Sequence, residues 1–77
     1  MRNVIDKIAT GKKLKELMER EGKSVKEISN TFGISETSVY KWLNGESLPS
    51  LNHLVGIVYY LRSTLDETLI PYPQYMK

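Results

Sequence analysis

Hydrophobic residues recur along this chain at the spacing of amphipathic helices, and no stretch alternates as a half-buried strand would. The longest stripe has apolar residues at positions 51, 54, 55, 58 and 61. Shorter stripes fall at positions 14, 17 and 18, at 28 and 32, at 39 and 42, and at 65 and 69. The pattern therefore predicts an all-α fold with five helices.

Stop and start signals place the ends of these helices. Glycines at 22, 33 and 45 each follow a helical pattern, where a left-handed residue closes a helix well. Residues able to cap helix starts are the capping boxes Ser24–Glu27 and Thr64–Glu67 and the serines Ser35 and Ser50. We therefore expect one helix ending near residue 21 and others over 25–32, 36–44, 51–61 and 65–69.

The start of the first helix is ambiguous, because Asn3 and Thr10 can each cap it. Gly11 then weakens the helix interior by about 1 kcal/mol. A chain of 77 residues supplies one hydrophobic core, so we expect one domain over residues 1–70. Pro71 and Pro73 end the last helix and begin a C-terminal tail over residues 71–77.

The tail contains two tyrosines and a methionine, which are unusual in a free chain end. It either folds back over the core, packs on a partner subunit or stays disordered, and packing is favoured. Within the helix over 51–61, Tyr59 and Tyr60 are adjacent, so at most one of them faces fully inward. The other tyrosine, together with Ile57, is expected to form an exposed apolar edge suited to a homodimer contact.

Composition argues against several classes of function. The chain has no cysteine, which excludes a disulfide, a thiolate nucleophile and a cysteine-based metal site. Its one histidine, His53, has no histidine or acid beside it in sequence, and no glycine-rich phosphate loop is present. We therefore expect no enzymatic activity, metal, cofactor or small-molecule substrate.

Hydropathy and charge at the N-terminus indicate a cytoplasmic protein. No apolar run approaches the roughly 18 residues of a membrane span. The first residues carry scattered charges, unlike a secretory signal peptide. We therefore expect no contact with a membrane.

The charge is unevenly distributed, although the net value is only +2. Residues 2–26 hold eight basic and four acidic side chains, whereas residues 27–77 hold three basic and five acidic ones. A basic half suggests a polyanionic partner, but scattered charges on helices are equally typical of a solvated surface.

Two short helices, over 25–32 and 36–44, are joined by only three residues, Gly33, Ile34 and Ser35. Such a link predicts a steep crossing, with the glycine supplying the positive φ that the turn requires. The apolar residues expected to share a core are Ile28, Phe32, Ile34, Val39 and Trp42. The side of the second helix left exposed is then Glu36, Thr37, Tyr40 and Lys41, with Ser38 at its edge.

An exposed helix of this kind fits the DNA major groove, which is about 12 Å wide. Lys41 can donate to guanine, and Glu36 can accept from cytosine. Thr37 can bond a base or pack its methyl group on thymine, and Tyr40 can reach a phosphate. The first turn of the preceding helix, Ser24 to Lys26, offers free amides and a lysine to the DNA backbone.

These motifs make the chain resemble the Cro/phage-repressor type of helix-turn-helix domain, also called the XRE family. The matching segments are LKEL (14–17), SVKEIS (24–29), FGIS (32–35), SVYKWLNG (38–45), LPSL (48–51) and TLDETL (64–69). The resemblance implies a compact five-helix repressor-like domain that binds double-stranded operator DNA, commonly as a two-fold homodimer. It implies base contacts by Glu36, Thr37, Ser38, Tyr40 and Lys41, and backbone contacts by Ser24, Val25, Lys26, Ser35 and Asn44.

The chain departs from the family pattern at several positions. Many relatives carry an Arg–Glu ion pair at the positions of Met18 and Leu43, so we expect an apolar contact here instead. Many have alanine in place of Ser29, where the two helices pass closest and serine is still small enough. Arg62 and Ser63 replace a usual glycine and apolar residue, so that turn is expected to differ.

The recognition region is also less basic than DNA binding favours. Residues 23–49 hold three lysines and three glutamates, which sum to zero charge. Because phosphate attraction supplies most non-specific affinity, we expect modest and strongly salt-dependent binding.

Two functions follow from this interpretation. The first is sequence-specific DNA binding by a transcriptional regulator, a repressor, that reads the major groove with the helix over 36–44. The alternative is a protein-interaction module with the same fold, such as a component of an antitoxin or anti-repressor system. DNA binding by the purified protein, lost in Lys41→Ala, discriminates between them.

Overall fold

The computed structural model describes residues 4–75 of the chain. These residues form α1 (Lys7–Glu21), α2 (Val25–Phe32), α3 (Glu36–Leu43), α4 (Leu51–Tyr60) and α5 (Leu65–Thr68), followed by a 3-10 turn at Pro73–Tyr75. The prediction of an all-α fold with five helices is confirmed. Every predicted helix end lies within one residue of the observed end, apart from the start of α1. None of the helices in the described residues is both long and apolar enough to cross a membrane.

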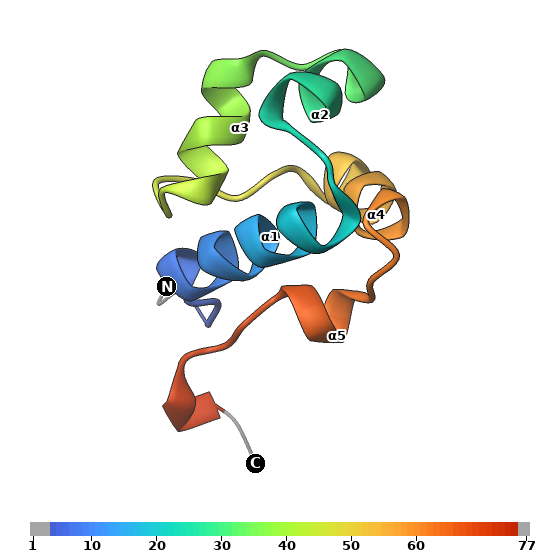
Figure 1. The fold of residues 1–77 in the computed structure, drawn as a ribbon. Helices are drawn as coiled ribbons and strands as arrows, with labels where there is room; N and C mark the ends of the chain where they lie inside the picture. Colours follow the sequence, from blue (N-terminus) through green and yellow to red (C-terminus); the bar gives the residue numbers. More distant parts are fainter. Residues whose placement is uncertain (1–3, 76–77) are drawn as a thin grey trace.

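The helices enclose a single core around α1. In Figure 1, α1 crosses the middle of the molecule, α2 and α3 lie on one side of it and α5 lies on the other. α1 contacts α3 and α5, while α2 contacts α3 and α4. The buried cluster contains Leu14, Leu17, Met18, Ile28, Val39, Trp42, Ile57 and Leu61, with Phe32 and Ile34 packed against it. The core predicted for the α2–α3 pair is therefore present.

The start of α1 differs from both predicted caps. The N-cap is Asp6, whose carboxylate accepts a hydrogen bond from the Ala9 N–H at 3.0 Å. Thr10 lies inside the helix and is fully buried, and its hydroxyl accepts the N–H of Ile70 at 3.0 Å. Asn3 lies outside the described residues. Thr10 is therefore not the cap, because the helix begins before it and continues through Gly11.

At Gly11, α1 packs directly against the backbone at the end of α3. A Cβ atom at this position would lie 2.5 Å from the Trp42 carbonyl oxygen and 2.6 Å from that of Leu43. Only glycine fits between these backbones. Gly11 weakens α1 as an isolated helix, but in the folded protein it allows α1 to pack closely against α3.

The segments that flank the five helices, residues 4–6 and 70–72, pair with each other. Residues Ile5 and Pro71 form an isolated antiparallel bridge. It is flanked by hydrogen bonds from the Asp6 N–H to the Ile70 carbonyl, at 2.7 Å, and from the Tyr72 N–H to the Val4 carbonyl, at 2.9 Å. The start of the tail therefore folds back on the domain, while the side chains of Tyr72 and Tyr75 are exposed. Met76 and Lys77 lie outside the described residues.

The apolar edge expected on α4 has a different composition. Ile57 is buried, with 3% of its surface exposed, whereas Tyr59 is 77% exposed and Leu51 is 70% exposed. Tyr60 turns inward and meets the Phe32 ring edge-on, with 5.6 Å between the ring centroids. Ile57, which was expected at the exposed edge, therefore lies in the core, and Leu51, which was expected in the core stripe, is exposed. The reason is that the core side of α4 is centred on residues 54, 57, 58 and 61.

The turn between α4 and α5 keeps the form of a glycine-closed helix end although Arg62 stands there. Arg62 has a φ of 57°, and its N–H donates to the Tyr59 carbonyl at 3.0 Å. The Ser63 N–H donates to the Val58 carbonyl at 2.9 Å, which completes a Schellman motif. Arg62 therefore adopts the left-handed conformation that glycine usually supplies at such a helix end. The left-handed conformation of a non-glycine residue costs about 1 kcal/mol or more.

The start of α5 forms only half of its predicted capping box. The Glu67 N–H donates to the Thr64 hydroxyl at 3.1 Å. The Glu67 carboxylate instead accepts the Ser63 hydroxyl at 2.6 Å and the Arg20 guanidinium at 3.5 Å. Arg20 also donates to the Leu61 carbonyl at 3.0 Å, so it ties the end of α1 to the α4–α5 turn.

Candidate functional site

The packing of α3 leaves one side of the helix exposed. Val39 and Trp42 are buried and anchor α3 to the core. The residues of the exposed side are Glu36, Thr37, Tyr40 and Lys41, which follow one another along the helix at the predicted spacing. Tyr40 is 51% exposed although it is aromatic. This side is therefore a continuous surface of mixed charged, hydroxyl and aromatic groups.

The turn that presents α3 is closed by hydrogen bonds of Ser29. Gly33 takes the left-handed conformation with a φ of 65°. The Ile34 N–H donates to the Ser29 carbonyl at 3.1 Å, and the Ser29 hydroxyl donates to the Ile34 carbonyl. Serine was expected here only because it is small, and its hydroxyl adds a link across the turn.

Ser35 and Ser38 are coupled at the start of α3. The Ser38 N–H donates to the Ser35 hydroxyl at 3.1 Å, and the Ser35 hydroxyl lies 2.9 Å from the Ser38 hydroxyl. Ser35 is exposed and Ser38 is half-buried, at the edge of the exposed side as predicted. Both hydroxyls therefore already have a partner in the helix cap.

The first turn of α2 stands next to this surface with free amide groups. Its capping box is complete: the Glu27 N–H donates to the Ser24 hydroxyl at 3.1 Å, and the Ser24 N–H donates to the Glu27 carboxylate at 3.2 Å. The N–H groups of Val25 and Lys26 have no acceptor inside the helix, as is general for a first turn. Ser24 and Lys26 are exposed, and Val25 is half-buried.

A hollow of about 370 Å³ lies between α1, the start of α2 and the end of α3; we call it the α1–α3 hollow. Its lining residues are Lys15, Met18, Glu19, Lys23, Ser24, Val25, Tyr40, Leu43 and Asn44. It brings together four of the residues predicted from the sequence, Ser24, Val25, Tyr40 and Asn44. It also adds Lys15, Glu19 and Lys23, which the sequence analysis did not select, because spacing within one helix does not reveal which side meets another helix.

The floor of the α1–α3 hollow is apolar. Met18 is buried, Leu43 is half-buried, and both belong to the same hydrophobic cluster. Met18 and Leu43 therefore form an apolar arrangement here, as the sequence predicted. Lys23 is turned toward α4, since its ammonium nitrogen lies 4.9 Å from the centroid of the Tyr60 ring.

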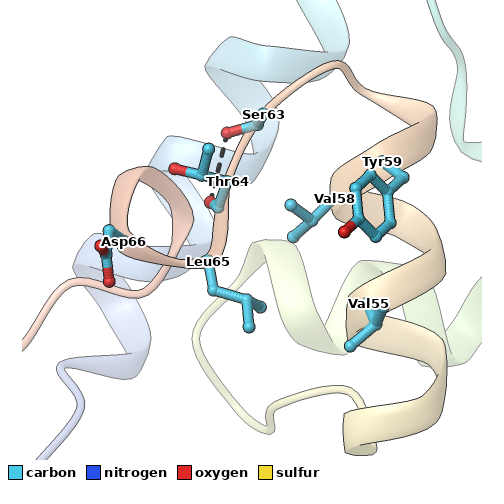
Figure 2. A pocket seen from close by; sticks show the side chains of 7 residues that line it. All are labelled: Val55, Val58, Tyr59, Ser63, Thr64, Leu65 and Asp66. Atoms are coloured by element: carbon cyan, nitrogen blue, oxygen red, sulfur yellow. Dashed lines mark hydrogen bonds between the residues drawn. The ribbon is translucent and has the colours of Figure 1, made fainter.

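A second surface feature lies between α4 and α5. Figure 2 shows Val55 and Tyr59 of α4 and Leu65 of α5 around one hollow, which has a volume of about 370 Å³. Leu51 continues the same stripe of α4 one turn earlier, since residues 51, 55 and 59 are spaced by four. We call Leu51, Val55, Tyr59 and Leu65 the α4–α5 face.

Comparison with known families agrees with this geometry. A family model described as helix-turn-helix matches residues 14–67, which are 54 of the 77 residues of the chain. The match begins within α1, contains α2, the turn and α3, and ends within α5. A comparison with curated proteins finds no significant match.

Proposed function

Because the chain belongs to the Cro/C1-type helix-turn-helix family, the XRE family of DNA-binding transcriptional regulators, we propose that it is a repressor that reads the major groove with α3. The observation that carries this proposal is the asymmetry of α3. Its inner side is fixed by Val39 and Trp42, and its outer side is free for contact over two turns. The family is a DNA-binding regulatory family rather than an enzymatic one, which supports a binding role for this surface.

The outer side of α3 offers groups that match base edges. Lys41 can donate to O6 and N7 of guanine, and Glu36 can accept from N4 of cytosine. Thr37 can bond a base or pack its methyl group against thymine, while Tyr40 can reach a phosphate or a thymine methyl group. Ser38 adds a hydroxyl at the edge. Each well-placed base contact discriminates against a wrong base by about 1–3 kcal/mol.

Contacts to the DNA backbone would fix the register of α3. The free amides of Val25 and Lys26 point out of the first turn of α2, where a phosphate is favoured. Ser24 and Ser35, at the N-caps of α2 and α3, and Asn44, at the C-terminal end of α3, can add hydrogen bonds. Since residues 23–49 carry no net charge, the affinity is modest and falls steeply with salt.

A two-fold homodimer through the α4–α5 face completes the proposal. Tyr59 and Leu51 are large apolar side chains that are exposed by 77% and 70%, and such a patch marks an interaction surface. A two-fold axis brings the same patch of both subunits together, so the patch has to be self-complementary. Asp66 lines the hollow of this face, and Arg62, of opposite charge, stands four residues before it in the α4–α5 turn. Neither forms a salt bridge within residues 4–75. In a two-fold dimer each of them can meet its opposite on the partner.

The DNA-binding proposal is tested by selection from a random duplex library with the purified protein at two salt concentrations. The variant Thr37→Ala/Lys41→Ala is selected in parallel, and Asn52→Ala/Lys13→Ala serves as a matched control away from α3. We expect an enriched palindrome with half-sites about 34–36 Å apart. It should be retained by the control and lost by the α3 variant. No enrichment from folded protein at low salt would overturn the proposal and favour the protein-interaction module.

The dimer is tested separately by sedimentation equilibrium at tens of micromolar protein. We expect the mass of two chains for the wild type and of one chain for Tyr59→Ser. Tyr75→Ser, which changes another exposed tyrosine on the C-terminal segment, should remain dimeric. A wild-type mass of one chain, or equal loss in both variants, would contradict the α4–α5 face as the interface.

A further inference from the structure

We propose that the α1–α3 hollow binds one sugar–phosphate step of the DNA backbone, with Lys15 of α1 as its phosphate-contacting cation. This inference rests on the proposed function, because it assumes that α3 enters the major groove. It extends the DNA interface to α1, a helix for which the sequence predicted no contact residue.

The position of Lys15 follows from the packing of α1 on α3. Gly11 meets the carbonyl groups of Trp42 and Leu43, so this side of α1 faces the end of α3. Lys15 stands one turn after Gly11 on the same side, is exposed, and lines the same hollow as Tyr40 and Asn44. A strand that touches Tyr40 and Asn44 therefore passes within reach of the Lys15 ammonium.

The rest of the hollow matches the chemistry of a sugar–phosphate step. The floor, formed by Met18, Val25 and Leu43, presents hydrocarbon to the C–H groups of a deoxyribose. The rim carries hydrogen-bonding groups on Ser24 and Asn44, which suit phosphate oxygens. An apolar floor with a polar rim thus offers complementary groups to both parts of the backbone unit.

The charges on the rim single out Lys15. Lys23 is engaged with the Tyr60 ring on the side toward α4. Among residues 4–75, Glu19 is the one acid that lines the hollow, and it opposes an incoming phosphate. The rim therefore carries +1 from two lysines and one glutamate, and its net charge falls to zero in Lys15→Gln and rises to +2 in Glu19→Gln.

Salt-dependent binding to the selected duplex tests this proposal. In Lys15→Gln we expect weaker binding and a salt slope, in log Kd against log salt concentration, that is smaller by about 0.9. Glu19→Gln should bind more tightly than the wild type. Lys13→Gln is the matched control, because Lys13 lies two residues away on α1 but its ammonium faces Glu16, at 3.9 Å.

The apolar floor is tested by hydroxyl-radical footprinting, which reports the exposure of each deoxyribose. We expect a protected sugar that becomes accessible in Leu43→Ala, with folding of the variant checked by circular dichroism. If the wild type binds no duplex, the proposed function fails. If the wild type binds but Lys15→Gln keeps the salt slope of Lys13→Gln, or Leu43→Ala leaves the footprint unchanged, only the role of the hollow is overturned.

Discussion

The contact between Gly11 and the end of α3 makes a sharp prediction for Gly11→Ala. In an isolated helix this change is stabilising by about 1 kcal/mol, because alanine has the higher helix propensity. In the folded protein the new Cβ atom would lie 2.5 Å from the Trp42 carbonyl oxygen and 2.6 Å from that of Leu43. We therefore expect the sign of the effect to reverse.

The magnitude follows from what has to move. Cβ atoms essentially never approach closer than 3.0 Å, so α1 and α3 must separate by at least 0.5 Å, the difference between 3.0 and 2.5 Å. The obstructing atoms are backbone carbonyls, which cannot rotate away as a side chain can. Overpacking of this kind costs about 1–3 kcal/mol or more, which exceeds the propensity gain. After the propensity gain of about 1 kcal/mol is subtracted, we expect a net loss of up to about 2 kcal/mol. For a domain of this size, Tm then falls by about 4–8 °C for each kcal/mol lost.

Thermal and urea unfolding, followed by circular dichroism, measures this loss. Gly56→Ala in α4 is the matched control, because its new Cβ atom would meet the Phe32 ring at 2.8 Å, and a ring can turn aside. We expect Gly56→Ala to change the free energy of unfolding much less than Gly11→Ala does. If Gly11→Ala is as stable as Gly56→Ala, the close packing of α1 on α3 at Gly11 does not contribute to the position of α3 or to the stability of the domain.

Three further predictions concern other parts of the fold. Ser29→Ala removes the hydroxyl that donates to the Ile34 carbonyl, and urea unfolding should show a net loss of up to about 1 kcal/mol, whereas a gain would contradict a role of this bond in the turn. Arg62→Gly removes the cost of a φ of 57°, so the free energy of unfolding of the monomer, measured at low protein concentration, should rise by about 0.5–1 kcal/mol. The same change should weaken dimerisation. The Ser63 hydroxyl and then the Arg20 guanidinium hold the pKa of the Glu67 carboxyl below its ordinary value of 4.5. The stability that the ionised Glu67 contributes is complete above pH 4.5 and is lost as the pH falls through the lowered pKa. The acid side of a curve of Tm against pH should therefore be flatter in Glu67→Gln than in the wild type. An unchanged curve would refute the contribution of Glu67.

The ends of the helices were predictable because local chemistry decides them. Ser24, Ser35 and Ser50 cap α2, α3 and α4 as expected, and Gly22 and Gly33 close α1 and α2 in the left-handed conformation. Each of these features depends on a few consecutive residues. The α2–turn–α3 unit, and with it the exposed side of α3, could therefore be predicted before any tertiary contact was known.

Features that depend on distant residues were not predictable in the same way. Gly11 looked like a weak point in α1 because its neighbour across the interface, the end of α3, is about thirty residues away. Asp6 caps α1 through a local bond to Ala9, and it was overlooked because Gly11 had been interpreted as a weak point near the start of the helix.

Which side of α4 is buried, and which residues of α1 lie beside α3, also depends on distant residues. The sequence predicted an apolar stripe on α4, but the side of α4 that packs on the core differs from that stripe, since Ile57 is buried and Leu51 is exposed. Lys15 carries no local signal that separates it from the other lysines of α1. Its place beside Tyr40 is a product of how α1 crosses α3.

The central claim is that the outer side of α3 reads base edges in the major groove, and base-analogue substitution tests it most directly. Single purines of the selected duplex are replaced by 7-deazapurines, which remove only the N7 acceptor on the major-groove edge. We predict that at least one replacement weakens binding of the wild type and that this loss disappears in Lys41→Ala. Full affinity of the wild type for every 7-deazapurine duplex would contradict major-groove reading by α3.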